Sequence, residues 1–136
     1  MANTFPVQIM TPEGAAYEGT AEMVSTRTQT GSIGIRANHS PLMAMLDPTE
    51  LRIYESESEI KRFAQGDGFL QMADNALLML VEEAIPVEEL DVAELRTRLE
   101  EAQGRLDGAE DGTADQERAQ RDVKRWTRYV EIAEGA

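Results

Sequence analysis

The side chains that could perform catalysis are few and poorly arranged for it. His39 is the only imidazole in the chain, and Ser40 follows it directly, which places the two side chains badly for base-assisted nucleophilic attack. We interpret His39 as a structural or interface residue. Four carboxylates are clustered near the middle of the chain, and we interpret them as solvated surface: Glu82, Glu83, Glu88 and Glu89. The sequence therefore predicts no enzyme.

Metal and phosphate sites have equally little support. The chain has no Cys, and no Gly is followed by Lys, which excludes thiolate ligands and a phosphate-binding loop of the Gly-Lys-Ser/Thr type. Residues 107–118 resemble a calcium loop in their Asp and Gly positions. However, Ala109 stands third and Arg118 stands twelfth, where a bidentate Glu is required. We expect a solvated acidic turn there, and neither a metal nor a cofactor.

A row of cations near the C-terminus is the strongest local departure from the acidic composition. Its members are Arg118, Arg121, Lys124, Arg125 and Arg128, and the four arginines recur at spacings of 3, 4 and 3. On a helix they share one face, which we expect to point away from the apolar stripe of that helix. Two interpretations stay open: a solubilising face with local ion pairs, or a docking face for an acidic partner.

Composition narrows the classes of function. The chain has 136 residues with 26 acidic and 13 basic side chains, so its formal net charge is −13. Such a charge disfavours binding to nucleic acid and to anionic membrane surfaces. The longest apolar run, residues 76–81, is far too short to span a bilayer, and the first residues lack the pattern of a secretory signal. We expect a soluble, cytoplasmic-type protein with one domain, or with a small domain and an appendage.

The elements that must position these residues differ between the two parts of the chain. Up to about Pro86, short apolar runs alternate with turn residues, which is typical of an antiparallel sandwich or barrel. Gly66-Asp67-Gly68 is the clearest turn, because glycine tolerates positive φ. The expected strands are residues 5–10, 21–28, 51–54, 60–65, 69–72 and 76–82.

After Pro86 the apolar period becomes that of a helix. Asp91 with Glu94, and Thr113 with Gln116, form two capping-box pairs, and an apolar stripe with spacings of 3 and 4 follows each. The first stripe is Val92, Leu95, Leu99, Ala102 and Leu106, and the second is Ala119, Val123, Trp126, Val130 and Ala133. We predict an α+β chain, with an antiparallel β-sandwich over residues 1–88 followed by an antiparallel two-helix hairpin over residues 89–136.

The segment from Gly31 to Leu42 carries the most specific pattern. Two glycines three residues apart are followed by His39-Ser40-Pro41-Leu42. This segment resembles the Gly-x-x-Gly-Ile…His-x-Pro-Leu stretch of the epsilon subunit of F-type ATP synthases. Residues 7–17, 66–70 and 78–84 and the helical hairpin follow in the order of that family, so the resemblance covers nearly the whole chain.

The resemblance implies a non-catalytic rotor subunit of the central stalk, which helps to couple proton-driven rotation of the c-ring to ATP synthesis in the catalytic head. It implies that the sandwich binds the gamma subunit and the c-ring, with candidate contacts at Gly31, Ser32, Ile33, His39 and Ser40. In an extended state, the hairpin would reach the alpha and beta subunits and inhibit ATP hydrolysis. Its candidate contacts are Arg118, Arg121, Lys124, Arg125 and Arg128. The implied location is the cytoplasmic face of the bacterial inner membrane, held there by partner subunits.

Some relatives bind ATP through an Asp-x-x-Arg-Ala stretch at the start of the first helix. Here Asp91 is followed three residues later by Glu94, whose charge opposes that of the phosphate-binding arginine. We therefore predict weak or absent ATP binding. Two other functions stay open: a free-standing module that binds another protein, and a regulatory module that senses nucleotides.

Overall fold

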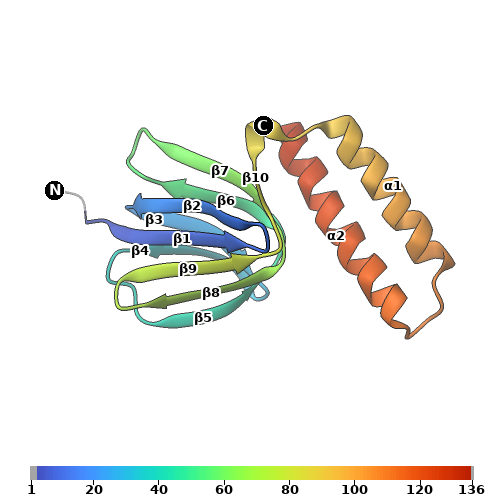
Figure 1. The fold of residues 1–136 in the computed structure, drawn as a ribbon, viewed down its shortest axis with the longest axis horizontal. Helices are drawn as coiled ribbons and strands as arrows, with labels where there is room; N and C mark the ends of the chain where they lie inside the picture. The colour runs from blue at the N-terminus through green and yellow to red at the C-terminus, as the bar shows by residue number, and fades with distance from the viewer. Residues whose placement is uncertain (1–2, 136) are drawn as a thin grey trace. The chain divides into compact units, whose positions relative to one another are not determined.

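A computed structural model describes residues 3–135 of the chain. The chain divides into two compact units between Pro86 and Val87, two residues before the boundary predicted at 88/89. The N-terminal unit consists of strands and the C-terminal unit contains two long helices (Figure 1). The predicted α+β class, a sandwich followed by a helical hairpin, is thereby confirmed.

The strands of the first unit form a folded sheet of ten strands. Along the chain they are β1 (Phe5–Thr11), β2 (Gly14–Ala21), β3 (Met23–Thr28), β4 (Gly31–Arg36), β5 (Leu42–Leu46), β6 (Thr49–Tyr54), β7 (Ile60–Gln65), β8 (Gly68–Ala73), β9 (Ala76–Val81) and β10 (Ala84–Pro86). The hydrogen-bonded order is β10-β7-β6-β3-β5-β8-β9-β1-β2, and β4 pairs with β3.

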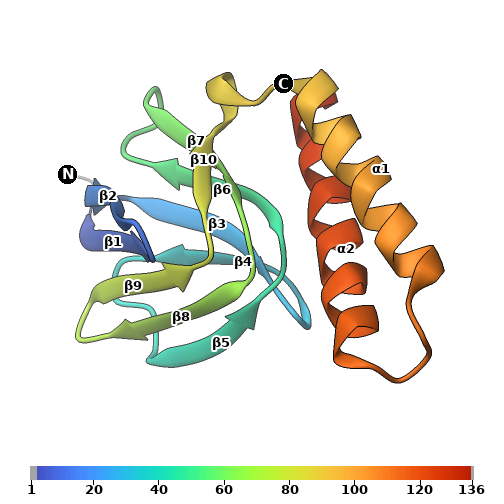
Figure 2. The same cartoon turned by 45° about the vertical axis from the view of Figure 1, so that its right-hand side comes forward.

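The sheet folds into two layers. One layer contains β10, β7, β6, β3 and β4, and the other contains β5, β8, β9, β1 and β2. Only the pair Thr28–Leu46 joins β3 to β5, so the layers meet at a narrow corner (Figure 2). One strand pair departs from the antiparallel arrangement, because β1 and β9 run parallel. These two strands are distant in sequence, so no short turn constrains their direction.

Alternating side chains of both layers fill the core. Phe5, Val7 and Ile9 of β1 are buried, as are Leu51 and Ile53 of β6, while the residues between them face outward. This alternation follows from the two-residue period of a strand.

One buried polar residue connects two strands of one layer with two loops. Gln65 of β7 is fully buried and accepts a hydrogen bond from Thr26 Oγ1 on β3. Its amide nitrogen donates to the carbonyl oxygens of Asp47 and Gly66, at 2.9 Å and 2.8 Å. Because its polar atoms are bonded, Gln65 avoids the free-energy cost of burying an unsatisfied amide.

The second unit begins with a short 3₁₀ helix, η1 (Val87–Glu89), followed by α1 (Val92–Gly108) and α2 (Ala114–Gly135). Asp91 caps α1 as expected, because its Oδ1 accepts hydrogen bonds from Ala93 N and Glu94 N. The capping box is incomplete, because the Glu94 carboxylate pairs with Arg98 at 3.0 Å. An ion pair one turn further along the helix competes successfully for this side chain.

The start of α2 also differs in detail from a standard capping box. Thr113 Oγ1 accepts from Gln116 N at 3.2 Å, as predicted. The Gln116 side chain accepts from Gly112 N at 2.8 Å, one residue before the capping residue. Both partners nevertheless satisfy backbone N–H groups where the helix begins.

The two helices are joined by cross-helix contacts. Arg105 of α1 pairs with Asp122 of α2 at 3.0 Å, and Arg96 pairs with Glu134. Arg98 lies over the Trp126 ring, 5.2 Å from its centroid. Contacts between the start of one helix and the end of the other confirm the antiparallel hairpin.

The predicted apolar stripes are only partly the buried ones. Leu95 and Ala102 of α1 and Ala119 and Trp126 of α2 are buried, as the periodicity indicates. Other buried residues of α2 lie outside its predicted stripe: Tyr129 and Ile132. The buried surface of α2 is therefore wider than a single stripe, and it turns toward the arginine side in the last turns of the helix.

Candidate functional site

The outer surface of the β5-β8-β9-β1 layer carries large apolar side chains. We define this apolar face by Met10, Met43, Met45, Phe69, Leu78 and Leu80. Met43 and Met45 are 69% and 56% exposed, and Leu80 is 38% exposed. Figure 2 shows the strands β5, β8 and β9 side by side. Exposed large hydrophobic side chains that lie together are typical of a protein-binding surface.

The register of the strands explains why these side chains lie together. Met45 is directly opposite Phe69, Phe69 is opposite Leu80, and Leu80 is opposite Met10. Residues directly opposite on paired strands point to the same side of the sheet. One apolar row therefore crosses four strands.

A second row runs beside the first and is partly polar. Met43 is opposite Gln71, Gln71 is opposite Leu78, and Leu78 is opposite Gln8. The inward positions between and next to the two rows are Leu70, Met72, Leu77 and Met79, all buried in the core. The layer of β5, β8, β9 and β1 thus carries apolar side chains on both of its surfaces, although only one of these surfaces packs inside the sandwich.

A shallow groove continues the apolar face toward the β8–β9 turn. It has a volume of about 540 Å³, and its lining includes the small residues Gly19, Ala73 and Ala76. Glu18 and Asp74 contribute carboxylates to its wall. The groove and the second row share Gln8, Gln71 and Leu78, so the two features form one continuous surface.

The structure places His39 and Ser40 in the loop that leads into β5. His39 Nδ1 lies 2.7 Å from the carbonyl oxygen of Ser40, so the imidazole contacts the backbone of Ser40 and this bond does not involve the serine hydroxyl. The backbone N–H of Asn38 donates to Asn75 Oδ1 at 2.6 Å, which fixes this loop beside the β8–β9 turn. His39 and Ser40 therefore lie at the border of the apolar face.

Gly31, Ser32 and Ile33 belong to the other layer. They begin β4, which pairs with β3, and Ser32 is opposite Arg27. Ile33 is half-buried and packs against the core, so its side chain serves packing. The structure therefore does not bring these three residues together with His39 and Ser40, which follow the far end of β4. The six-residue strand β4 separates the two groups.

The cationic row on α2 does not form a single exposed face. Arg118, Arg121 and Lys124 are exposed, but Arg125 and Arg128 are half-buried. The Arg125 side chain is 18% exposed and lies over the Trp126 ring, 4.3 Å from its centroid. The expectation that all four arginines point away from the buried surface was therefore wrong, because α2 is buried over a wide arc.

Most members of this row have carboxylate partners on the same helix. Arg125 pairs with Asp122 at 3.3 Å, Arg128 pairs with Glu131 at 3.0 Å, and Arg118 pairs with Asp115. These local pairs are those expected of a solvated helix surface. Arg121 is also exposed, and along the helix it lies between the pair of Arg118 and the pair of Arg125.

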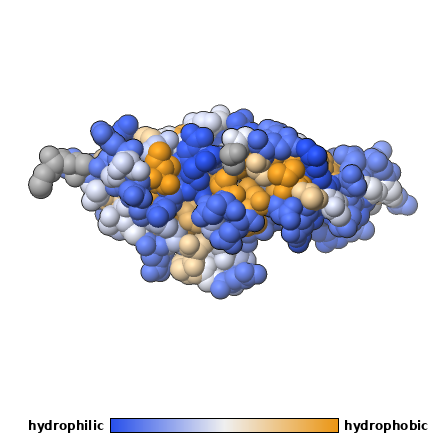
Figure 3. Space-filling view, turned by 90° about the horizontal axis from the view of Figure 1, so that it is seen from above, coloured by the Kyte–Doolittle hydropathy of each residue, from blue (hydrophilic) through white to orange (hydrophobic). Residues whose placement is uncertain are grey.

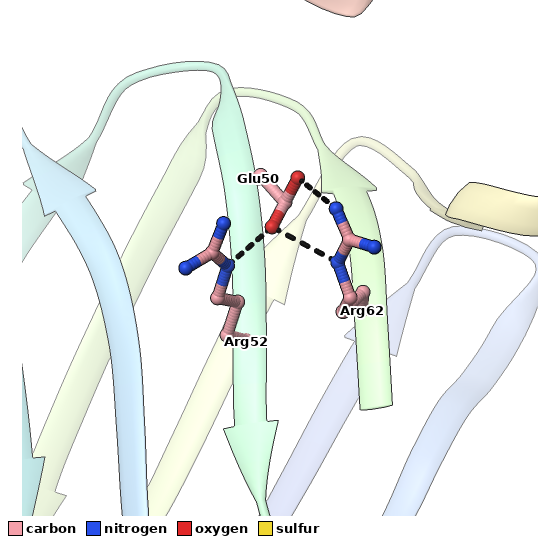
Figure 4. Close-up of polar contacts among 3 residues, drawn as sticks. All are labelled: Glu50, Arg52 and Arg62. Atoms are coloured by element: carbon pink, nitrogen blue, oxygen red, sulfur yellow. Dashed lines mark hydrogen bonds and ion pairs between the residues drawn. The ribbon is translucent and has the colours of Figure 1, made fainter. Parts of the chain in front are cut away.

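A charged cluster lies on the outer surface of the layer opposite the apolar face. Glu50 of β6 accepts hydrogen bonds from Arg62 at 2.9 Å and 3.1 Å, and it also pairs with Arg52 (Figure 4). Its side chain is 13% exposed. Burial alone would raise the pKa of Glu50, but the hydrogen bonds from Arg62 and Arg52 hold that pKa below its ordinary value. The cluster is a structural contact between β6 and β7.

Tyr17 links β2 of one layer to residues of the other layer. The Tyr17 hydroxyl on β2 donates to Glu55, which follows β6, and the Tyr17 ring meets Phe63 edge-to-face at 6.2 Å. Burial, followed by the contact with the Glu55 carboxylate, raises the pKa of Tyr17. The phenol therefore stays protonated, and it serves as a hydrogen-bond donor.

The described residues show no group of three or more His, Cys, Asp and Glu side chains that could hold a metal ion. In the same part of the chain, neither helix is both long enough and apolar enough to cross a membrane. Figure 3 shows one face of the molecule as mainly hydrophilic with small hydrophobic patches.

Comparison with known proteins gives this surface a context. The family model described as "ATP synthase, Delta/Epsilon chain, beta-sandwich domain" matches residues 4–87. The ATP synthase epsilon chain of Rubrobacter xylanophilus is 36% identical over 127 residues, covering 91% of this chain and 85% of the relative. The chain belongs to the ATP synthase delta/epsilon chain family.

Other members of the delta/epsilon chain family match over the helices as well. The ATP synthase epsilon chain of Halalkalibacterium halodurans is 32% identical over 130 residues, covering 96% of this chain and 97% of that one. A chain in the structure of the Euglena gracilis mitochondrial ATP synthase has the same fold, with a TM-score of 0.79 at 20% identity. That likeness covers 94% of this chain and 79% of the other. The resemblance inferred from residues 31–42 is confirmed.

Sequence reasoning missed the apolar face. The segments 42–46 and 76–81 are apolar at nearly every position, although a strand with one solvated surface should alternate. That lack of alternation was the available signal. Which of these side chains meet on one surface depends on strand pairing, and the pairing of β9 with β1 has no local sequence signature.

Proposed function

We propose that this chain is a non-catalytic subunit of an ATP synthase, and that it docks on its rotary central stalk. The apolar face carries this proposal, because it offers a row of large hydrophobic side chains across four strands. Burial of such side chains contributes about 1.5–3 kcal/mol for each one that becomes fully buried. The partner proposed for this face is the gamma subunit.

The c-ring is proposed as the second partner of the sandwich. His39 and Ser40 lie at the border of the apolar face and can extend the contact beyond the gamma subunit. The similar chain from Euglena gracilis comes from a structure that its description names as containing OSCP, F1 and the c-ring. Bound to both, the sandwich would transmit rotation of the c-ring and help to couple it to ATP synthesis in the catalytic head.

The helical hairpin is proposed to be a regulatory element. Arg118, Arg121 and Lys124 are exposed and could meet acidic segments of the alpha and beta subunits when the hairpin is extended. Such contact would obstruct rotation and inhibit ATP hydrolysis. We propose that the start of α1 does not bind ATP, because Glu94 places a carboxylate beside the helix N-terminus. The proposed location is the cytoplasmic face of a bacterial inner membrane, reached through partner subunits.

The experiment that tests docking introduces charge into the apolar face. The full-length chain carrying Met43→Glu and Met45→Glu is used to recover gamma and c subunits from solubilised membranes, beside the unchanged chain. Ile60→Glu is the matched control, because Ile60 is 42% exposed but lies on β7, in the other layer. We expect recovery to fail for the double variant and to persist for the control. Equal recovery with all three chains would refute docking through this face.

A further inference from the structure

The methionines of the layer that carries the apolar face differ sharply in their exposure to solvent. Met43 and Met45 of β5 are 69% and 56% exposed, the highest values among the large hydrophobic side chains of the described residues. Met72 of β8 and Met79 of β9 are fully buried in the same layer. This layer therefore presents the thioethers of Met43 and Met45 to solvent, keeps those of Met72 and Met79 away from it, and leaves Met10 of β1 half-buried.

Exposed thioethers react with two-electron oxidants such as hydrogen peroxide. The sulfur lone pair attacks one peroxide oxygen, an S–O bond forms as the O–O bond breaks, and the departing hydroxide takes a proton to leave as water. The sulfur is oxidised to a sulfoxide while peroxide is reduced to water. A flexible apolar side chain thereby becomes polar and requires a hydrogen-bond donor when it is buried.

We propose that Met43 and Met45 make the apolar face an oxidation-sensitive docking site, so that their sulfoxides prevent the unassembled chain from binding its central-stalk partner. This inference rests on the proposed docking function. Beyond docking itself, it assigns a modification site, names peroxide-type oxidants as the reagent, and states that the modification inhibits binding. The modification is reversible by methionine sulfoxide reductases, so the site could return to its binding state.

The two positions differ in what surrounds them. The row of Met45 continues with Phe69, Leu80 and Met10, none of which offers a side-chain N–H or O–H group. The row of Met43 continues with Gln71, whose amide can donate to a sulfoxide oxygen. We therefore expect oxidation of Met45 to weaken docking more than oxidation of Met43.

Protection by the bound partner provides a second, independent readout, because docking should exclude the oxidant from both sulfur atoms. The rate of oxidation at Met43 and Met45 should therefore fall when the gamma subunit is present, while the buried Met72 and Met79 stay slow in both conditions.

The test uses the full-length chain, purified gamma subunit of the same ATP synthase, and hydrogen peroxide. After graded exposure, peptide mass spectrometry locates the sulfoxides and calorimetry measures binding to gamma. We expect Met43 and Met45 to oxidise before Met72 and Met79, and the Kd for gamma to rise at least about tenfold, or about 1.4 kcal/mol. Reduction by methionine sulfoxide reductase should restore the original Kd.

The matched variant carries Met43→Leu and Met45→Leu, which keeps apolar volume and removes the two exposed sulfur atoms of the face, while the half-buried Met10 is left unchanged. We expect its affinity for gamma to be unaffected by the same peroxide treatment. Unchanged affinity of the oxidised natural chain would overturn the inference, and so would equal loss in the leucine variant. Failure of the unoxidised chain to bind gamma would instead refute the docking function itself, and the inference with it.

Discussion

At the scale of single residues, Glu50 makes the stability of the sandwich depend on pH. Its pKa lies below the ordinary value for an unfolded chain, which is about 4.3. The contact with Arg52 and Arg62 therefore stabilises the fold fully above that value. This stabilisation is lost as the pH falls through the unfolded pKa toward the folded one.

The variant Glu50→Gln should isolate this contribution. At about pH 7 we expect it to lower the free energy of unfolding by about 1 kcal/mol, because both arginines are partly exposed. The deficit should shrink toward about pH 3, which is below the unfolded pKa of about 4.3, because the stabilisation by the carboxylate is progressively lost there. Urea denaturation at both pH values measures it, with the exposed Glu57→Gln as control. A deficit that is independent of pH would contradict this account.

Substitution by alanine is expected to have opposite effects on stability at two glycines. A Cβ atom at Gly68 would lie 2.0 Å from the carbonyl oxygen of Leu80, whereas a Cβ atom at Gly104 would meet nothing within 4 Å. Gly68→Ala must push β8 away from β9 and should destabilise the sandwich by about 2–3 kcal/mol. Gly104→Ala should stabilise α1 by about 0.5–1 kcal/mol. Denaturation followed by circular dichroism distinguishes them, and equal effects would show that the close approach at Gly68 is absent.

At the scale of elements, the start of α1 depends on one side chain. Asp91 Oδ1 accepts from Ala93 N at 3.0 Å and from Glu94 N at 3.3 Å. Asp91→Ala should lower the stability of the hairpin by about 1 kcal/mol, while Asp91→Asn should retain most of it. Thermal unfolding of the full chain measures the effect. Glu100→Ala, an exposed substitution within the same helix, is the control, and an equal loss there would remove the cap as the cause.

The elements that could be predicted from the sequence are those with a clear local signal. Both helices begin at the predicted capping residues, because a side-chain acceptor and a change of period coincide at Asp91 and at Thr113. Strand β2 escaped prediction because it contains Gly14 and Gly19 and small residues that weaken alternation. Strand β5 escaped because it also lacks alternation and is only five residues long.

The apolar face could not be assembled from local signals at all. Its members come from β1, β5, β8 and β9, and only the pairing of distant strands puts Met45, Phe69 and Leu80 in one row. The same limit applies to the basic row on α2. Its spacing is helical as predicted, but the burial of Arg125 depends on the Trp126 ring and on a wide packing surface.

At the scale of the whole molecule, the proposed regulatory role of the hairpin can be separated from docking. Arg121 is exposed, and Glu117, which is also exposed on the same helix, provides a control of opposite charge. Arg121→Glu should raise ATP hydrolysis by the reconstituted complex about twofold, since an exposed ion pair contributes about 0.5 kcal/mol. Glu117→Gln should leave hydrolysis unchanged. Unchanged hydrolysis in both variants would remove the inhibitory role and leave docking intact.

Docking through the apolar face is the central claim, and hydrogen–deuterium exchange tests it most directly. Exchange of the full-length chain is measured alone and with a saturating amount of gamma subunit. We predict slower exchange in β5, β8 and β9, with little change in β3, β4 and β6. Protection confined to β3, β4 and β6, or no protection in the sandwich, would contradict the account.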